Sequence, residues 1–258
     1  MGQPADTGQL QIRCRRSAGI NSHLSRSMAN DSMTDFDYDP IPLDPPEVLA
    51  PGVILNDALA YRDRIARRRT VRDFSDEPID RAVIEACVLA AGSAPSGANH
   101  QPWHFACVSD PDIKRAIREA AEAEEQAFYG GRAGETWLND LKKLGTDASK
   151  PFLETAPWLI AVFAERYGID EKGARQKHYY VPESVGIATG FLINAFHELG
   201  IATLTHTPNP MRFLNQILRR PSNERPYVLL VVGHPAQTAM VPRAAAVKKP
   251  LEQIASFK

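Results

Sequence analysis

The sequence is poor in cysteine and carries almost no net charge. Only three of its 258 residues are Cys, at positions 14, 87 and 107, and none belongs to a CxxC pair. With His also scattered, the sequence predicts no structural zinc or other metal site. Cys87 and Cys107 lie in apolar runs, so we expect both to be buried free thiols in a reducing compartment.

Long apolar runs are also missing. No stretch approaches the roughly 20 apolar residues needed to cross a bilayer. The N-terminal Arg13, Arg15 and Arg16 are not followed by an apolar core, which excludes a secretory signal in this segment. The formal net charge of -1 provides no basic field to hold nucleic acid or an anionic membrane. We therefore expect a cytoplasmic protein with neither nucleic acid nor membrane as partner.

Two regions differ in composition. Residues 1–40 are polar, rich in Ser, Asp and Asn, and lack helical or strand periodicity, which predicts a disordered extension. Residues 41–258 predict one α+β domain, a central sheet wrapped by helices. Helices are expected near residues 54–69, 80–92, 110–129, 183–199 and 209–219, and strands near 103–108, 157–163, 201–205 and 227–232.

Extended arms are expected at both ends of this domain. Residues 40–51 are rich in Pro, and the tail after His234 is polar and broken by three prolines. Such arms have little to pack on within their own chain. A second copy would give them a surface, which favours a two-fold homodimer with exchanged ends. The alternative is that both arms are simply flexible.

A basic run, Arg67-Arg68-Arg69-Thr70-Val71-Arg72, follows the first expected helix. Several guanidiniums and one hydroxyl in a short run suit a phosphate dianion, which Arg binds through two parallel hydrogen bonds. Each charge-assisted hydrogen bond contributes about 1.5–3 kcal/mol. The same run is also typical of a solvated basic helix end.

Two further stretches have the composition of binding loops. Residues 93–103 (SAPSGANHQPW) join a helix to a strand, and their small residues allow the backbone to approach a flat ligand closely. Thr205 and Thr207 stand at the end of a strand, where hydroxyls commonly line sites. The first is equally explained as a tight connection, and the second as ordinary β-structure.

Together, residues 68–72 and 95–103 resemble the RRSxR-like and PSxxNxQPW-like segments of the nitroreductase superfamily. The resemblance implies a nitroreductase-like fold with a mainly antiparallel sheet. It also implies FMN bound at a homodimer interface, with each site built from both subunits.

A narrower resemblance is to the iodotyrosine deiodinases. Their helix after the loop carries a Glu and, four residues later, a Tyr, and a lid with a WxxDLKKL-like run and a Lys follows. This sequence has Glu125, Tyr129, the run WLNDLKKL at 137–144, and Lys150, so the resemblance implies that residues 130–150 are an active-site lid. The likeness covers about residues 55–258.

Glu125, Tyr129 and Lys150 also make chemical sense without the family. Glu125 and Tyr129 are four residues apart and share one helix face. A carboxylate for an ammonium group and an ammonium for a carboxylate complement a zwitterionic amino acid. The alternative is a salt-bridged surface helix.

The resemblance assigns a role to each remaining candidate. The phosphate of FMN falls to Arg68, Arg69 and Thr70, and its ribityl or pyrimidine end to Arg72. The loop residues Pro95, Ser96 and Gly97 and the strand-end Thr205 also contact the cofactor, and the Ala98 backbone donates to the substrate phenolate. Thr207 is the catalytic candidate, because its hydroxyl hydrogen-bonds flavin N5 and favours single-electron steps. Lys248 stands where the family usually has Arg, which keeps the charge but loses the planar fork.

The expected activity is the reductive dehalogenation of a halotyrosine. Two rivals remain: a general nitro-, quinone- or enone-reducing flavoenzyme that uses NAD(P)H, and a flavin-binding protein without turnover. No GxGxxG fingerprint is present, so the sequence does not identify the electron donor; NAD(P)H, if it is used, is expected to bind transiently or to a separate reductase.

Overall fold

The computed structural model describes residues 39–44, 46 and 48–258. The predicted disordered extension therefore lies, except for its last two residues, outside the described residues. Leu49–Lys258 form one compact unit. Its helices are α1 (Pro51–Ile65), α2 (Arg81–Gly92), α3 (Pro111–Ala127), α4 (Glu135–Lys142), α5 (Phe152–Thr155), α6 (Val181–Glu198), α7 (Phe213–Ile217) and α8 (Arg243–Ala246). Its strands are β1 (Trp103–Val108), β2 (Trp158–Glu165), β3 (Tyr167–Ile169), β4 (Arg175–Lys177), β5 (Ala202–His206) and β6 (Glu224–Gly233).

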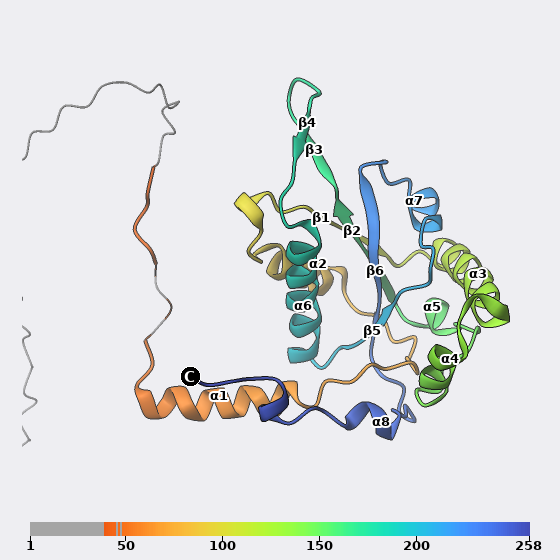
Figure 1. Cartoon of the computed structure of the whole chain (residues 1–258), viewed down its shortest axis with the longest axis horizontal. Coiled ribbons are helices and arrows are strands. Elements are labelled where there is room, and N and C mark those ends of the chain that lie inside the picture. The colour runs from red at the N-terminus through yellow and green to blue at the C-terminus, as the bar shows by residue number, and fades with distance from the viewer. Residues whose placement is uncertain (1–38, 45, 47) are drawn as a thin grey trace, which may run out of the picture. The chain divides into compact units, whose positions relative to one another are not determined.

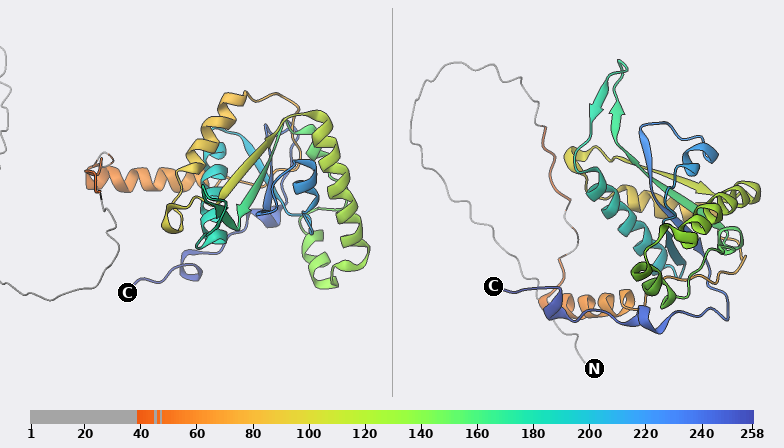
Figure 2. Two further views of the ribbon diagram at one scale, coloured as in Figure 1. Left: turned by 90° about the horizontal axis from the view of Figure 1, so that it is seen from above. Right: turned by 45° about the vertical axis from the view of Figure 1, so that its right-hand side comes forward.

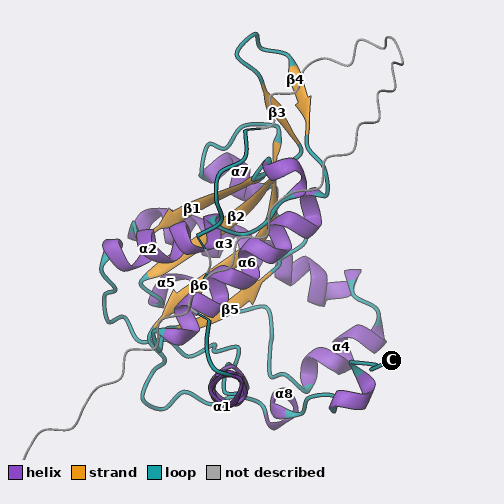
Figure 3. Ribbon diagram, turned by 90° about the vertical axis from the view of Figure 1, so that its left-hand side faces the viewer, coloured by secondary structure: helices purple, strands orange, loops and turns teal. Residues whose placement is uncertain are grey.

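Four strands form a wholly antiparallel sheet in the order β1-β2-β6-β5. Helices α2 and α6 lie on one side of this sheet and α3, α5 and α7 on the other (Figures 1 and 3). The predicted α+β fold with a central antiparallel sheet wrapped by helices is confirmed. The exchanged dimer arms remain a prediction.

Strand β2 shows how the sequence builds a core on each face of the sheet. Leu159, Ala161 and Phe163 belong to the cluster beneath α3, α5 and α7, and the alternate residues Ile160 and Val162 to the cluster beneath α2 and α6. Because side chains alternate along a strand, a strand covered on both faces must be apolar throughout. The strand expected at 227–232 lies within β6, and all of these residues are buried except Tyr227, which is exposed.

Some elements differ from expectation. The first helix ends at Ile65 rather than near 69, because Thr70 pairs with Thr203 of β5 and draws the chain into an extended path. The segment 130–150, for which no helix was expected, contains α4, and no residue of α4 is buried. The β3–β4 hairpin, which projects from the sheet (Figure 2), was missed. Its turn is built by the Asp170 carboxylate, which accepts from the N–H groups of Lys172 and Ala174.

Cys87 is a buried free thiol as expected, but Cys107 is exposed. The prediction for Cys107 was wrong because β1 is an edge strand that α2 covers incompletely, leaving Cys107 on the wall of a cavity. No helix in the described part of the chain has the length and apolar character needed to span a membrane.

Candidate active site

A cavity of about 160 Å³ lies between the end of β5 and the segment that runs from α3 to α5. Of the candidates named from sequence, it brings together Arg72, Glu125, Tyr129, Lys150, Thr205 and Thr207. These residues come from four separate stretches of the chain, so their convergence was not a consequence of sequence proximity.

Helix α3 and the turn that follows it supply the Glu125 carboxylate and the Tyr129 phenol. Its N-terminus is set by Asp110, whose carboxylate accepts from the N–H groups of Asp112 and Ile113, and by Pro111 at the first helical position. Ile117 and Ala121 bury one face against the sheet. Glu125 then lies one turn further along, and Tyr129 follows in the π-helical turn Phe128–Arg132 that ends the helix.

Lys150 is the most enclosed charged group of the cavity. Its side chain is 3% exposed, and its Nζ lies 3.5 Å from Oε2 of Glu125, which is 14% exposed. The ammonium also donates to Oγ1 of Thr146 at 3.3 Å and to the carbonyl oxygen of Asp147. Its backbone N–H donates to the Glu122 carboxylate at 2.6 Å. A buried charge with this many partners is fixed in position before any ligand arrives.

Tyr129 lines the same cavity as Glu125 and Lys150. Its hydroxyl donates to the carbonyl oxygen of Thr146 at 3.2 Å, and the Lys150 ammonium lies 5.6 Å from the centre of its ring. Burial raises the pKa of the Tyr129 phenol, and the nearby Glu125 carboxylate raises it further. The phenol therefore stays protonated at neutral pH and acts as a hydrogen-bond donor.

The roof of the cavity is aromatic and comes from α4. Trp137 and Leu141 line the cavity, and the Trp137 ring meets the Phe128 ring edge-on with centroids 4.9 Å apart. Trp137 nevertheless stays 58% exposed in the single chain. The roof is thus a thin apolar cover rather than part of the core.

His206 was missed as a site residue. It is 7% exposed and lines the cavity beside Thr205 and Thr207, and its Nε2 is buried with no hydrogen-bond partner among the described residues. Burial lowers the pKa of His206 to about 3, and the positive charges of Lys150 and Arg72 contribute. The only sequence signal was a lone His inside a threonine cluster at a strand end.

The other candidates do not line this cavity. Thr70 lies beside β5, where it forms a parallel bridge with Thr203. Arg68 and Arg69 follow the end of α1, and the Arg69 guanidinium donates to the carbonyls of Ala66 and Arg68. Lys248 is exposed in the C-terminal segment.

The loop with Pro95, Ser96, Gly97 and Ala98 also lies apart from the cavity, against the start of α6. The Gly97 N–H donates to Oγ of Ser184 at 3.3 Å, and a Cβ at Gly97 would lie 2.5 Å from the carbonyl oxygen of Tyr179. Ala98 has a φ of 50°, a left-handed conformation that is uncommon for a residue other than glycine. Only Gly fits at position 97, against the Tyr179 carbonyl. The small residues of the loop are therefore needed for packing as well as for any ligand.

Comparison with known proteins gives consistent matches. Residues 65–234 match the model of the nitroreductase family. The chain is 54% identical to an iodotyrosine deiodinase of Haliscomenobacter hydrossis over 192 residues, which cover 74% of this chain and 86% of that protein. It is 46% identical to an iodotyrosine deiodinase of Nematostella vectensis, over 74% of this chain and 72% of that protein.

Solved structures give the same result. A crystal structure of oxidized iodotyrosine deiodinase bound to FMN and 3-iodo-L-tyrosine superposes with a TM-score of 0.65 and 31% sequence identity, and the match covers 77% of this chain and 98% of that chain. A BluB-like flavoprotein from Clostridium difficile superposes with a TM-score of 0.59 at 22% identity, which shows a shared fold.

Proposed function

Because this chain belongs to the nitroreductase family, we propose that it is an FMN-dependent oxidoreductase that reductively removes halide from a halotyrosine. The proposal rests above all on one cavity, in which Glu125, Tyr129 and Lys150 face the threonine hydroxyls at the end of β5. Its similarity to iodotyrosine deiodinases supports the same substrate class.

The residues of this chain fit FMN. The basic segment that holds Arg68, Arg69 and Thr70 is tied to the β5 edge of the sheet by the Val71 N–H, which donates to the Thr203 carbonyl at 3.3 Å. The exposed hydroxyl-bearing Thr205 follows along the same strand. One sheet edge therefore offers cations for a phosphate and, further on, hydroxyls for a polar ring. FMN supplies the electrons of the reduction when it is bound.

Recognition of the substrate follows from the pairing of Glu125 with Lys150. In the free chain the two groups neutralise each other. A zwitterionic amino acid offers each of them a new partner: its ammonium for Glu125 and its carboxylate for Lys150. Glu125 and Lys150 would each exchange one oppositely charged partner for another, so ligand binding leaves neither charge buried without a partner. A plain halophenol offers neither partner.

The segment 130–150 acts in this proposal as the lid that closes over the substrate. Trp137 and Leu141 of α4 cover the cavity, and Lys150 lies at the end of the segment. Closure excludes water from the reacting groups. Thr207 also lines this cavity, and in the proposal its hydroxyl would donate a hydrogen bond to N5 of the flavin.

The exposed apolar residues of this chain support a homodimer in which both copies contribute to the site. Helix α1 has 15 residues and buries none of them, although it carries apolar side chains such as Leu55, which is 61% exposed. An isolated helix of this length is marginal in water. Ile187 and Phe191 of α6 and Leu251 and Ile254 of the C-terminal segment are exposed as well. We infer that a second copy covers these residues and that its loop 95–98 completes the cavity.

The electron donor in this proposal is NAD(P)H, used directly or through a separate reductase. The compartment is the cytoplasm, because the free thiols of Cys87 and Cys107 suit a reducing environment.

The proposal is tested by reducing the FMN-loaded protein without oxygen and then adding 3-iodotyrosine, 4-nitrophenol or a quinone separately. We expect 3-iodotyrosine to reoxidise the flavin fastest, with release of iodide. Fast reoxidation by nitrophenol or quinone alone would instead identify a general reductase. Reoxidation by none of them would identify a flavin-binding protein without turnover.

A further inference from the structure

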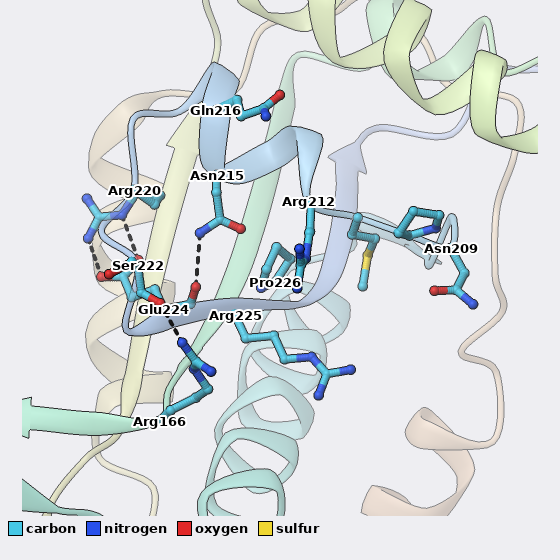
Figure 4. A pocket seen from close by; sticks show the side chains of 12 residues that line it. Arg166, Asn209, Arg212, Asn215, Gln216, Arg220, Ser222, Glu224, Arg225 and Pro226 are labelled. Carbon is cyan, nitrogen blue, oxygen red and sulfur yellow. Dashed lines mark hydrogen bonds and ion pairs between the residues drawn. The ribbon is translucent and has the colours of Figure 1, made fainter.

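A second cavity, of about 580 Å³, lies between α7 and the first residues of β6 (Figure 4). It shares one lining residue, Asn209, with the candidate active site. None of the residues proposed to bind the phosphate of FMN lines it. It is therefore a neighbour of the active site, and the proposed function leaves it without a role.

The walls of this cavity carry four arginines and one glutamate. The glutamate is already neutralised: Glu224 is 5% exposed and accepts from Nε of Arg220 at 2.7 Å and from the second arm of the same guanidinium. Arg166 donates to the carbonyl of Ser222 at 2.7 Å. Arg212 and Arg225 form no ion pair with any described residue. Within the described part of the chain, three of the four arginines of this cavity are therefore without an ion-pair partner, although the formal net charge is -1.

The walls are held in place by their own hydrogen bonds. The Asn215 side chain donates to the Glu224 carbonyl at 2.9 Å, and the Arg166 backbone N–H donates to the Asn223 carbonyl at 2.9 Å. In Figure 4, Arg166 and Arg220 lie with Ser222 at one end of the cavity, and Arg212 and Arg225 lie towards Asn209 at the other. Because like charges brought together repel one another, an anion bound here would stabilise this arrangement.

We propose that this cavity binds the phosphate group of a small molecule through Arg212 and Arg225. The planar guanidinium presents two parallel N–H donors that match phosphate oxygens. The volume lies within the roughly 300–1,000 Å³ typical of small-molecule sites. Pro210, Met211 and Pro226 add apolar surface for an organic part, and Gln216 adds an amide.

The cavity is open to solvent at Arg212 and Arg225, whose side chains are exposed in the single chain. It lies beside α7, which packs on the same face of the sheet as α3 and α5. The exposed apolar residues Ile187 and Phe191 lie on α6, which packs on the opposite face. A ligand can therefore reach the arginines from solvent.

The test uses FMN-loaded protein, so that the flavin's own phosphate site is already filled, and calorimetric titration at low ionic strength. We expect ADP to bind at one site per chain and adenosine not to bind. ADP that binds more tightly than inorganic phosphate would identify a phosphorylated organic molecule as the ligand, and equal affinities would identify free phosphate. Either result supports the phosphate site.

The double variant Arg212→Gln/Arg225→Gln should weaken ADP binding by about 100-fold or more, because each lost charge-assisted hydrogen bond accounts for roughly tenfold. Both side chains are exposed, so FMN content and the unfolding midpoint should not change. Arg219→Gln is the matched control: it removes the same charge from an exposed residue that does not line the cavity. The proposal is overturned if neither ADP nor phosphate binds, or if the double variant binds ADP as well as the control does. Neither result depends on halotyrosine turnover, so the proposed function is tested separately.

Discussion

Replacing Glu125 by Gln tests zwitterion recognition most sharply. The substitution keeps the shape of the side chain and removes the charge that we assign to the substrate ammonium. A charge-assisted hydrogen bond contributes about 1.5–3 kcal/mol, so the dissociation constant of 3-iodotyrosine should rise roughly 10- to 150-fold. A plain iodophenol has no ammonium, and its dissociation constant should change by less than about threefold.

Both constants can be measured by titrating the FMN-loaded protein and following the flavin fluorescence. Lys150 keeps its bonds to Thr146 and Asp147 in the variant, so the protein should stay folded with its ammonium still partly compensated. Glu119→Gln on the same helix is the matched control, because Glu119 is exposed and lies outside the cavity. Equal losses of affinity for iodotyrosine and iodophenol would refute the assignment.

Three further predictions concern the pH dependence, the lid and the dimer. His206 has a folded pKa of about 3 against an ordinary 6.5, so the unfolded chain binds the extra proton between these values and stability falls as pH falls. The free energy of unfolding in urea should therefore fall between pH 7 and pH 5 by roughly 2 kcal/mol less in His206→Asn than in the unchanged protein. An equal fall in both proteins would contradict a buried neutral imidazole. Trp137→Ala should weaken iodotyrosine binding about tenfold, because the roof is lost, yet lower the free energy of unfolding by less than about 1 kcal/mol, because the ring is half-exposed; a large stability loss without an affinity change would show that Trp137 belongs to the core. Leu55→Lys should convert the dimer to monomer in analytical ultracentrifugation and release FMN, whereas Ile113→Lys on α3 should do neither; a dimer that survives Leu55→Lys would exclude α1 from the interface.

Most of the fold was predictable because its strongest signals are local. The uniformly apolar runs of β2 and β6 predict strands covered on both faces, and Gly92 and Gly200 mark the ends of α2 and α6. The hairpin β3–β4 was missed because its strands are three residues each and β4 is entirely polar. Its stability comes from the turn at Asp170, which no periodicity reveals.

The site was only partly predictable, for a different reason. Glu125 and Tyr129 share a helix face, so their proximity follows from sequence spacing. The contact of both with β5 is tertiary, and His206 could not be identified as buried and unpaired until the sheet and α5 had been placed around it. Arg68 and the loop residue Ala98 were linked to the site by family resemblance alone. Our account links Arg68 to the site through the β5 edge of its own chain and the loop through a second copy of the chain.

The account is tested most directly by counting the products of a single anaerobic turnover. Protein loaded with reduced FMN is mixed with excess 3-iodotyrosine, and iodide and tyrosine are quantified against the flavin that is oxidised. We predict about one iodide and one tyrosine for each flavin, because the cofactor carries the reducing electrons and the lid protects the reaction from side products. Oxidised flavin without tyrosine, or unchanged reduced flavin, would contradict the account.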